Sequence, residues 1–184
     1  MDPVISVIIP THNGGNTLSK AVNSVLVQSC QDFEIILIDD GSDKSTKEVI
    51  ANILKKDSRI TLLTNQNNLG FVKSLNKGVA AAHGKYIARL DDDDCWIDEN
   101  KIEKQINFLE NNKDYVLSGG GVVKIYANGE EFVRYLLPEK DEDIRKIILI
   151  NNAFAHSSVV FTKESFEKTT ELWAKALFIK IIFL

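Results

Sequence analysis

The chain contains few of the residues on which several protein classes depend. Only two of its 184 residues are cysteines, Cys30 and Cys95, and they lie far apart in unlike surroundings. This number and spacing exclude a disulfide-bonded framework and the usual zinc-binding patterns, and they suit a reducing compartment. We therefore expect a cytoplasmic protein.

Long apolar runs are also missing. No stretch approaches the roughly 20 consecutive apolar residues that span a bilayer. The opening segment MDPVISVIIPTHN lacks a basic start and its apolar run stops at Pro10, so it does not resemble a secretory signal. The C-terminal ALFIKIIFL is apolar but short and carries Lys180, so any contact with the inner face of the membrane is expected to be peripheral.

Neither sign of charge dominates the chain. The 26 acidic and 22 basic residues leave a net charge of −4, without a basic block that could bind a phosphate backbone. We therefore expect no nucleic-acid partner. The hydrophobic fraction of 44% and the charged fraction of 26% are ordinary for a soluble globular protein, and the length fits one domain.

What the sequence does contain is an alternation of strand-like and helix-like segments. Strand-like runs at 4–9, 33–40, 59–65 and 85–90 alternate with amphipathic helical patterns. Asn16 or Thr17 could cap the first helix, and the helix that starts near residue 70 is expected to stop at Gly84. This order predicts an α/β fold with a mainly parallel central sheet flanked by helices.

The pattern changes after a further amphipathic helix through Ile102, Ile106 and Leu109. Residues 115–137 are typical of strands around an Asn128-Gly129 hairpin turn. A helical stretch at 141–150 and a short strand at 157–162 follow. We therefore expect an antiparallel hairpin added to the parallel sheet.

Polar residues follow three of the predicted strands. The first strand ends in PTHNGG, the second in DDGSD, and the fourth in DDDD at residues 91–94. Each motif alone is more typical of an ordinary turn or a solvated loop. However, the carboxyl ends of parallel strands meet at one rim, where ligands bind in open α/β sheets. Together the motifs therefore predict one site at this rim.

Clustered carboxylates at such a rim suit a hard divalent cation, Mg²⁺ or Mn²⁺. Such an ion needs only one or two carboxylates, because phosphate oxygens and water fill its other positions. The more distant Asp39 and Asp40 could instead accept hydrogen bonds from a donor such as a uracil N–H. We therefore predict one acidic group for a base and another for a metal and a diphosphate.

Three blocks of the sequence resemble the family 2 inverting glycosyltransferases, in particular the bacterial members that synthesise polysaccharides. The blocks run from SVIIPTHNGG to DDGSDKST, from NNLGFVKS to ARLDDDD, and through NNAFAHSSVVFTKESF. The resemblance implies the Rossmann-like type A fold that binds nucleotide sugars. It implies a glycosyltransferase catalytic domain at 1–167, best matched in its donor half, and an atypical tail at 168–184 that we expect to be truncated.

The resemblance also implies an activity. Members are hexosyltransferase-type enzymes that move a sugar from a nucleotide diphosphate donor to an acceptor hydroxyl with inversion. A UDP-sugar is the expected donor, a glycan or glycolipid the expected acceptor, and Mn²⁺ or Mg²⁺ the expected cofactor. The setting would be the biosynthesis of a surface polysaccharide or glycolipid.

The resemblance assigns residues to the donor site. The nucleotide-binding residues that it implies are Pro10, Thr11, Asn13, Asp39, Asp40, Lys73 and Asp91. Among them, Asp40 with Asp39 is expected at the uracil, and Lys73 at the diphosphate or ribose.

The metal ligands that it implies are Asp93 and Asp94, with Asp91 and Asp93 matching the Asp-x-Asp motif. Asp92 occupies the variable position and is expected to be only a loop residue. Arg89 either orients these carboxylates or is a surface arginine, and His156 lies on the acceptor side or is structural.

The catalytic base is where this sequence departs from the family. The family's base is an acid in a Glu-Asp…Leu-Trp stretch that follows a Gly-rich segment. Here Leu172-Trp173 is kept, but Thr169-Thr170 precede Glu171 and the Gly-rich segment is missing. Glu171 is the nearest acid and therefore the candidate catalytic residue. The alternative is an inactive nucleotide-sugar-binding remnant that lacks the base.

Overall fold

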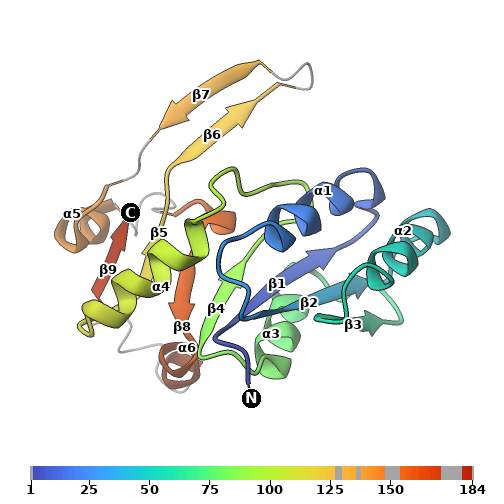
Figure 1. Ribbon diagram of the computed structural model, residues 1–184, viewed down its shortest axis with the longest axis horizontal. Coiled ribbons are helices and arrows are strands. Elements are labelled where there is room, and N and C mark those ends of the chain that lie inside the picture. The colour runs from blue at the N-terminus through green and yellow to red at the C-terminus, as the bar shows by residue number, and fades with distance from the viewer. Residues whose placement is uncertain (1, 127–129, 136–137, 148–153, 171–179, 184) are drawn as a thin grey trace.

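The computed structural model describes residues 2–126, 130–135, 138–147, 154–170 and 180–183. These residues form a seven-stranded sheet of order β3-β2-β1-β4-β8-β5-β9 and a two-stranded sheet of β6 and β7 (Figure 1). The strands are β1 (Ile5–Thr11), β2 (Phe33–Asp40), β3 (Ile60–Asn65), β4 (Tyr86–Arg89), β5 (Tyr115–Gly119), β6 (Val122–Ile125), β7 (Glu131–Tyr135), β8 (Val160–Thr162) and β9 (Lys180–Phe183). The helices are α1 (Gly15–Leu26), α2 (Lys44–Leu54), α3 (Phe71–Ala81), α4 (Lys101–Asn111), α5 (Asp141–Ile147), α6 (Lys163–Thr170) and the short 3₁₀ helix η1 (His156–Ser158).

The first four strands form the parallel half of the large sheet. β1 pairs in parallel with β2 and β4, and β2 pairs in parallel with β3. Every residue of β1 is buried, as expected for a strand that is covered on both faces. β8 lies between β4 and β5 and runs antiparallel to both. The predicted α/β fold with a mainly parallel sheet is therefore confirmed.

Helices cover both faces of this sheet (Figure 1). Ile5, Val7 and Ile9 of β1 belong to one hydrophobic cluster, together with buried residues of α1, α2 and α4. Ile8 points to the opposite face and packs in a second cluster with residues of α3 and α6. Because successive side chains of a strand point to opposite faces of the sheet, β1 contributes residues to both hydrophobic clusters. Each fully buried aliphatic side chain contributes about 1.5–3 kcal/mol to stability.

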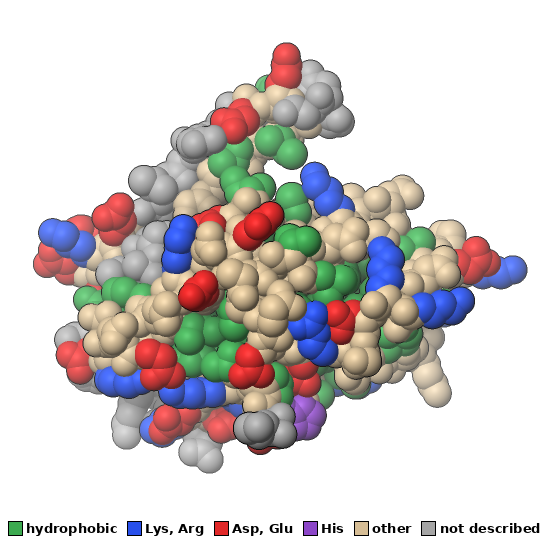
Figure 2. All heavy atoms as spheres, viewed as in Figure 1, with side chains coloured by type: hydrophobic (Ala, Val, Ile, Leu, Met, Phe, Trp, Pro, Cys, Tyr) green, Lys and Arg blue, Asp and Glu red, His purple; other side chains and the backbone are tan. Residues whose placement is uncertain are grey.

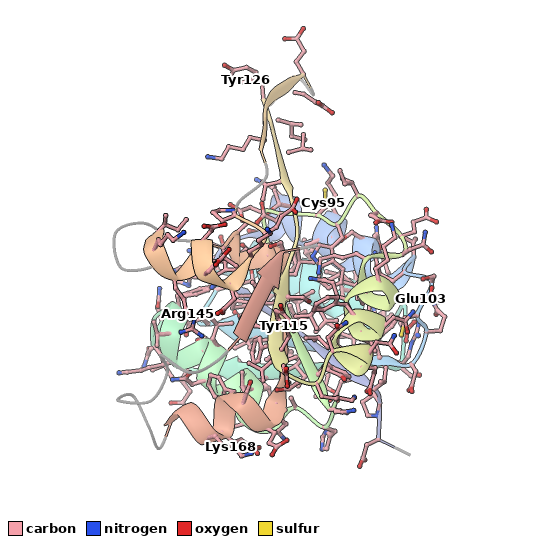
Figure 3. All side chains as sticks on the ribbon, turned by 90° about the vertical axis from the view of Figure 1, so that its left-hand side faces the viewer. Cys95, Glu103, Tyr115, Tyr126, Arg145 and Lys168 are labelled. Atoms are coloured by element: carbon pink, nitrogen blue, oxygen red, sulfur yellow. The ribbon has the colours of Figure 1, made fainter. Side chains whose placement is uncertain are left out.

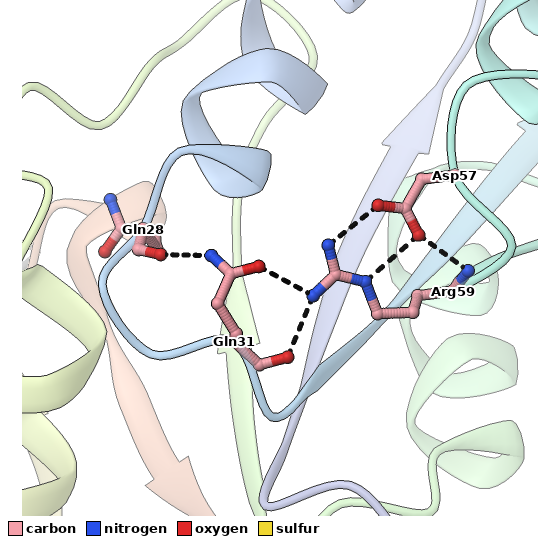
Figure 4. A network of polar contacts seen from close by, with 4 residues as sticks. All are labelled: Gln28, Gln31, Asp57 and Arg59. Atoms are coloured by element: carbon pink, nitrogen blue, oxygen red, sulfur yellow. Dashed lines mark hydrogen bonds and ion pairs between the residues drawn. The ribbon is translucent and has the colours of Figure 1, made fainter.

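Arg59 ties together the rim at the amino ends of the strands (Figure 4). Its Nη1 donates to the backbone and side-chain oxygens of Gln31, at 2.8 and 3.0 Å. Its Nε and Nη2 donate to Asp57 at 3.0 and 2.7 Å. The guanidinium also lies 3.9 Å from the centre of the Phe33 ring. This polar cluster joins the starts of β2 and β3, at the rim opposite the polar strand ends singled out by sequence.

The antiparallel addition is a hairpin of β6 and β7 that projects away from the body of the fold (Figures 1 and 3). Val122 pairs with Tyr135 and Lys124 with Val133. Tyr126 lies near the far end of β6 (Figure 3). The predicted pairing is confirmed, while the Asn128-Gly129 turn lies outside the described residues.

Two predicted helix ends are wrong, and a glycine lies close to another segment of the chain at both. The N-cap of α1 is Gly14, which makes no side-chain cap, and a Cβ there would lie 1.9 Å from Asp92 Oδ2. Asn16 and Thr17 therefore lie inside the helix. α3 ends at Ala81, before Gly84. Gly84 instead allows the chain to pass β1, since a Cβ there would lie 2.5 Å from the backbone nitrogen of Ser6.

The C-terminal part adds an edge strand. β9 pairs in parallel with β5, and residues 171–179 lie outside the described part of the chain. α6 spans the predicted division after residue 167, and that division stays a prediction. In the ranges that the structure describes, we find no helix that is both long and apolar enough to cross a membrane. Basic and acidic side chains are interspersed over the face seen in Figure 2.

Candidate functional site

A cavity of about 530 Å³ opens at the carboxyl ends of β1, β2 and β4. Its volume is typical of a small-molecule site. The residues that line it are Pro10, Thr11, His12, Asp40, Asn68, Gly70, Phe71, Ser74, Arg89, Asp91, Asp92, Asp93 and His156. The cavity therefore brings together five residues that the sequence singled out for binding: Pro10, Thr11, Asp40, Asp91 and Asp93.

Strand register explains this convergence. Thr11 at the end of β1 pairs with Asp39 of β2, so Asp40 is the next residue beyond that level. Arg89 pairs with Ile8, and the acidic loop (residues 91–96) follows directly. Two acidic groups that are far apart in sequence thus reach the same rim, as predicted.

Asp40 forms one wall of the cavity by holding the loop between β3 and α3 (residues 66–70). Its Oδ1 accepts hydrogen bonds from Asn65 Nδ2 and the Leu69 N–H, both at 2.8 Å, and its Oδ2 accepts from the Gly70 N–H at 3.0 Å. Burial alone would raise the pKa of this carboxyl, but the hydrogen bonds outweigh burial and lower the pKa below its usual value. Asp40 is therefore an ionised group within a nearly saturated network.

The network continues behind Asp40. Asn65 Nδ2 also donates to Ser74 Oγ at 3.0 Å, and Lys77 Nζ donates to Asn65 Oδ1 at 2.7 Å. A carboxylate has about four acceptor positions, of which the contacts from Asn65, Leu69 and Gly70 use three. The expected contact of Asp40 with a uracil stays a prediction.

Asn13 connects two loops of the rim, Asp39 holds the start of the loop after β2, and neither residue lines the cavity. The Asn13 N–H donates to Ser42 Oγ at 3.1 Å, and Asn13 Oδ1 accepts from the Asp43 N–H at 2.8 Å. Asp39, which is 2% exposed, accepts from the Ser42 N–H at 2.8 Å. These bonds tie the β1–α1 loop to the β2–α2 loop. Nucleotide contacts of Asn13 and Asp39 stay predictions.

Arg89 fixes the first carboxylate of the acidic loop. Its Nε and Nη2 donate to the two oxygens of Asp91, at 2.9 and 3.0 Å. Its guanidinium carbon lies 4.1 Å from the centre of the Phe71 ring. Only 15% of the Arg89 side chain is exposed, so the interpretation as a surface arginine is wrong and the orienting role is confirmed for Asp91.

Asp92 is more than a loop residue. It lines the cavity, and its Oδ2 accepts a hydrogen bond from Thr11 Oγ1 at 2.5 Å. Burial raises the pKa of Asp92, and the neighbouring charges of Asp93 and Asp91 raise it further against the effect of Thr11. Sequence alone does not reveal this contact, because nothing in a run of four aspartates distinguishes the one that faces Thr11.

Ser157 holds the other end of the acidic loop. Its Oγ donates to Asp94 Oδ2 at 2.5 Å and accepts from the Asp91 N–H at 3.0 Å. Loss of water raises the pKa of Asp94, although the Ser157 bond and Arg89 oppose the rise. Asp93 and Asp94 are both exposed, but the carboxylate of Asp93 makes no hydrogen bond or ion pair within the described residues.

The carboxylates at the cavity fit a hard divalent cation that takes most of its ligands from phosphate oxygens and water. Among the residues that the structure describes, no group of three or more His, Cys, Asp and Glu side chains is arranged to hold a metal ion. Asp93 nevertheless offers an unengaged carboxylate at the cavity. Mg²⁺ or Mn²⁺ can be held by one or two carboxylates when phosphate oxygens and water complete the shell.

Three further residues were singled out by the sequence, and only one of those that the structure describes lines the cavity. Lys73 is exposed on α3 outside the cavity lining, and its contact with a diphosphate stays a prediction. His156 lines the cavity, and burial together with the Arg89 charge lowers its pKa. Glu171 lies outside the described residues. Sequence reasoning did not single out His12, Asn68, Gly70, Phe71 and Ser74, although they lie within the PTHNGG and NNLGFVKS segments.

The chain is similar in sequence to known glycosyltransferases. The family model described as "Glycosyl transferase family 2" matches residues 6–170. An uncharacterized glycosyltransferase of Haemophilus influenzae is 36% identical over 163 residues, which are 89% of this chain and 64% of that protein. The UDP-Glc:alpha-D-GlcNAc-diphosphoundecaprenol beta-1,3-glucosyltransferase WfgD of Escherichia coli is 35% identical over 140 residues, 76% of this chain and 53% of that protein.

Solved structures show the same fold. The mannosyltransferase PcManGT from Pyrobaculum calidifontis, in complex with GDP-Man and Mn²⁺, gives a TM-score of 0.74 at 14% identity over all of this chain and 55% of that chain. S. aureus TarS 1-349 in complex with UDP-GlcNAc gives a TM-score of 0.74 at 18% identity, over all of this chain and 56% of that chain. The predicted type A fold is thus confirmed. The chain spans less than two thirds of the length of each of these proteins.

Proposed function

Because the chain belongs to glycosyl transferase family 2, we propose that its cavity binds a nucleotide diphosphate sugar, with UDP as the nucleotide. The main support is that the Asp40-held loop and the acidic loop line one cavity at the carboxyl ends of parallel strands. A second support is that WfgD, a relative at 35% identity, is named for the donor UDP-Glc.

In this proposal, one side of the cavity binds the nucleoside and the other side binds the cation and the diphosphate. Asp40 and the 66–70 loop would face the uracil and ribose, where hydrogen-bond acceptors and backbone groups can select the base. Asp93 and Asp94 would hold a divalent cation, which supplies positive charge to stabilise the leaving diphosphate. Arg89 would hold the Asp91 carboxylate fixed beside them.

The reaction proposed is transfer of the sugar to an acceptor hydroxyl with inversion at the anomeric carbon. A glycan or glycolipid of a surface polysaccharide pathway is the proposed acceptor, in line with the relatives. A carboxylate must remove the hydroxyl proton, and Glu171 is the candidate for this step.

Calorimetric titration of UDP with and without Mn²⁺ tests the donor site. We expect Mn²⁺ to tighten UDP binding at least about tenfold, equivalent to about 1.4 kcal/mol. Asp93→Ala should abolish this gain. Asp32→Ala is the matched control, because Asp32 is an exposed acid next to β2 at the opposite rim. Equal gains in Asp93→Ala and wild type would sink the metal assignment, and absence of UDP binding would sink the donor site.

A separate assay distinguishes an enzyme from a donor-binding remnant. Release of UDP from UDP-glucose and UDP-N-acetylglucosamine is measured for the wild-type chain and for Glu171→Gln. Turnover that falls at least about 100-fold in the variant would support Glu171 as the base. UDP-sugar binding with turnover at background level would instead identify the remnant.

A further inference from the structure

We propose that Ser157 is the positioning residue that sets the geometry of the acidic loop for cation binding. The inference rests on the proposed function, because it takes this loop as the cation side of the donor site. Ser157 belongs to η1 and lies 66 residues after Asp91 in sequence. Part of the site is therefore built by a segment distant from every acidic residue in it.

A single hydroxyl engages both ends of the aspartate run. Ser157 Oγ accepts from the Asp91 N–H at 3.0 Å and donates to Asp94 Oδ2 at 2.5 Å. The Asp94 N–H also donates to the Asp91 carbonyl at 3.1 Å, which closes a tight turn. The exposed residue Asp93 lies between these two fixed points. The turn therefore presents Asp93 outward with its neighbours already held.

Ser157 is itself fixed by the end of the acidic loop. Its carbonyl accepts from Trp96 Nε1 at 2.6 Å. Trp96 is 8% exposed, and its N–H donates to Ser24 Oγ at 3.1 Å. Lys101 Nζ lies 4.2 Å from the centre of the Trp96 ring. The loop and η1 thus anchor each other through the hydroxyl and the backbone of one serine.

The adjacent serine provides a control within the same 3₁₀ helix. Ser158 Oγ accepts from the Gly120 N–H at 3.1 Å and donates to the Ala155 carbonyl at 2.8 Å. These contacts lead away from the acidic loop. Loss of the Ser158 hydroxyl should therefore affect packing near β5 and leave the loop unchanged, whereas loss of the Ser157 hydroxyl should affect the loop.

The first test measures how much Mn²⁺ improves UDP binding in wild type, Ser157→Ala, Ser157→Thr and Ser158→Ala. Substitutions of groups that orient metal ligands typically cost about 10–100-fold in metal affinity. We expect Ser157→Ala to lose at least about tenfold of the Mn²⁺-dependent gain while UDP binding in EDTA stays within about twofold. Ser157→Thr keeps a hydroxyl and should retain most of the gain, as should Ser158→Ala.

The second test needs neither metal nor nucleotide. Amide hydrogen exchange at Asp91 should accelerate by at least about tenfold in Ser157→Ala, because the N–H loses its acceptor. Ser158→Ala should leave this rate unchanged. The inference is overturned when Ser157→Ala matches Ser158→Ala in both measurements. Absence of any Mn²⁺ effect in wild type would instead contradict the proposed function, and Asp91 exchange would then decide alone whether Ser157 orders the loop.

Discussion

Replacement of Asp40 by asparagine should destabilise the protein, because the amide cannot reproduce the acceptor pattern of the carboxylate. Asp40 is 4% exposed and accepts three hydrogen bonds. The remaining amide oxygen can still serve Asn65 and Leu69, which share one oxygen of the carboxylate. The new Nδ2 would then face the Gly70 N–H. Both groups are hydrogen-bond donors, so this hydrogen bond is lost.

The magnitude follows from these contacts. A hydrogen bond to a charged group contributes about 1.5–3 kcal/mol, and one such bond is lost in Asp40→Asn. Asp40→Ala loses all three bonds, but the exposed Leu69 segment can regain water, and the cost of burying a charge disappears. We therefore expect a loss in the free energy of unfolding of about 2 kcal/mol for Asp40→Asn and about 3 kcal/mol for Asp40→Ala.

Urea unfolding at several pH values provides the assay. The folded-state pKa of Asp40 is lowered, so its contribution is present above the ordinary carboxyl pKa of about 4 and is lost as pH falls through the folded value. The gap between wild type and Asp40→Asn should therefore be constant from about pH 5 to 8 and shrink below about pH 4.

The control for this experiment is Asp93→Asn at the same rim. Asp93 is exposed and unengaged within the described residues, so its stability should change by no more than about 0.5 kcal/mol. An Asp40→Asn effect as small as this, or a gap that does not shrink as the pH falls below about 4, would refute the reasoning.

Two further substitutions test other parts of the structure. Burial lowers the pKa of Lys101 to about 7, although nearby Asp98 opposes the shift. Between about pH 7 and 10 the unfolded chain therefore binds more protons than the folded chain. The free energy of unfolding should rise over this range by up to about 1.4 kcal/mol per pH unit. Lys101→Met should remove this slope in urea unfolding at pH 7, 8 and 9, and a parallel slope in the variant would contradict it. Gly14→Ala would bring a Cβ to 1.9 Å from Asp92 Oδ2, so it should cost about 1–3 kcal/mol and weaken UDP binding. Asn16→Ala, at an exposed position of α1, is the control for calorimetric Tm, and an unchanged Tm and affinity for Gly14→Ala would disprove the steric argument.

The parts of the fold that could be predicted are those that depend on local pattern. The apolar runs of β1 and β2 indicate strands buried on both faces, and polar residues at their ends indicate the rim where ligands bind. Asp40 and Asp91 could be placed at one cavity because parallel strands align their carboxyl ends. None of this required knowledge of individual contacts.

The rest depends on approaches between distant segments. The Asp92 carboxylate occupies the space beside Gly14, the N-cap of α1, and nothing in the sequence near Gly14 indicates that neighbour. The sequence around Ser157 does not indicate its role, because its partners lie 63 and 66 residues away. Hydrogen-bond partners of this kind are decided by tertiary packing, which periodicity and residue preference do not encode.

The position of β8 between β4 and β5 bears on how the site forms during synthesis. Strands β1 to β4 come from residues 5–89, whereas Ser157 comes 63 residues after Asp94. At about 5–20 residues per second, the segment that carries Ser157 leaves the ribosome several seconds after the aspartates. The acidic wall of the cavity therefore needs a part of the chain that is made late, whereas every hydrogen-bond partner of Asp40 in the other wall is made before the aspartates.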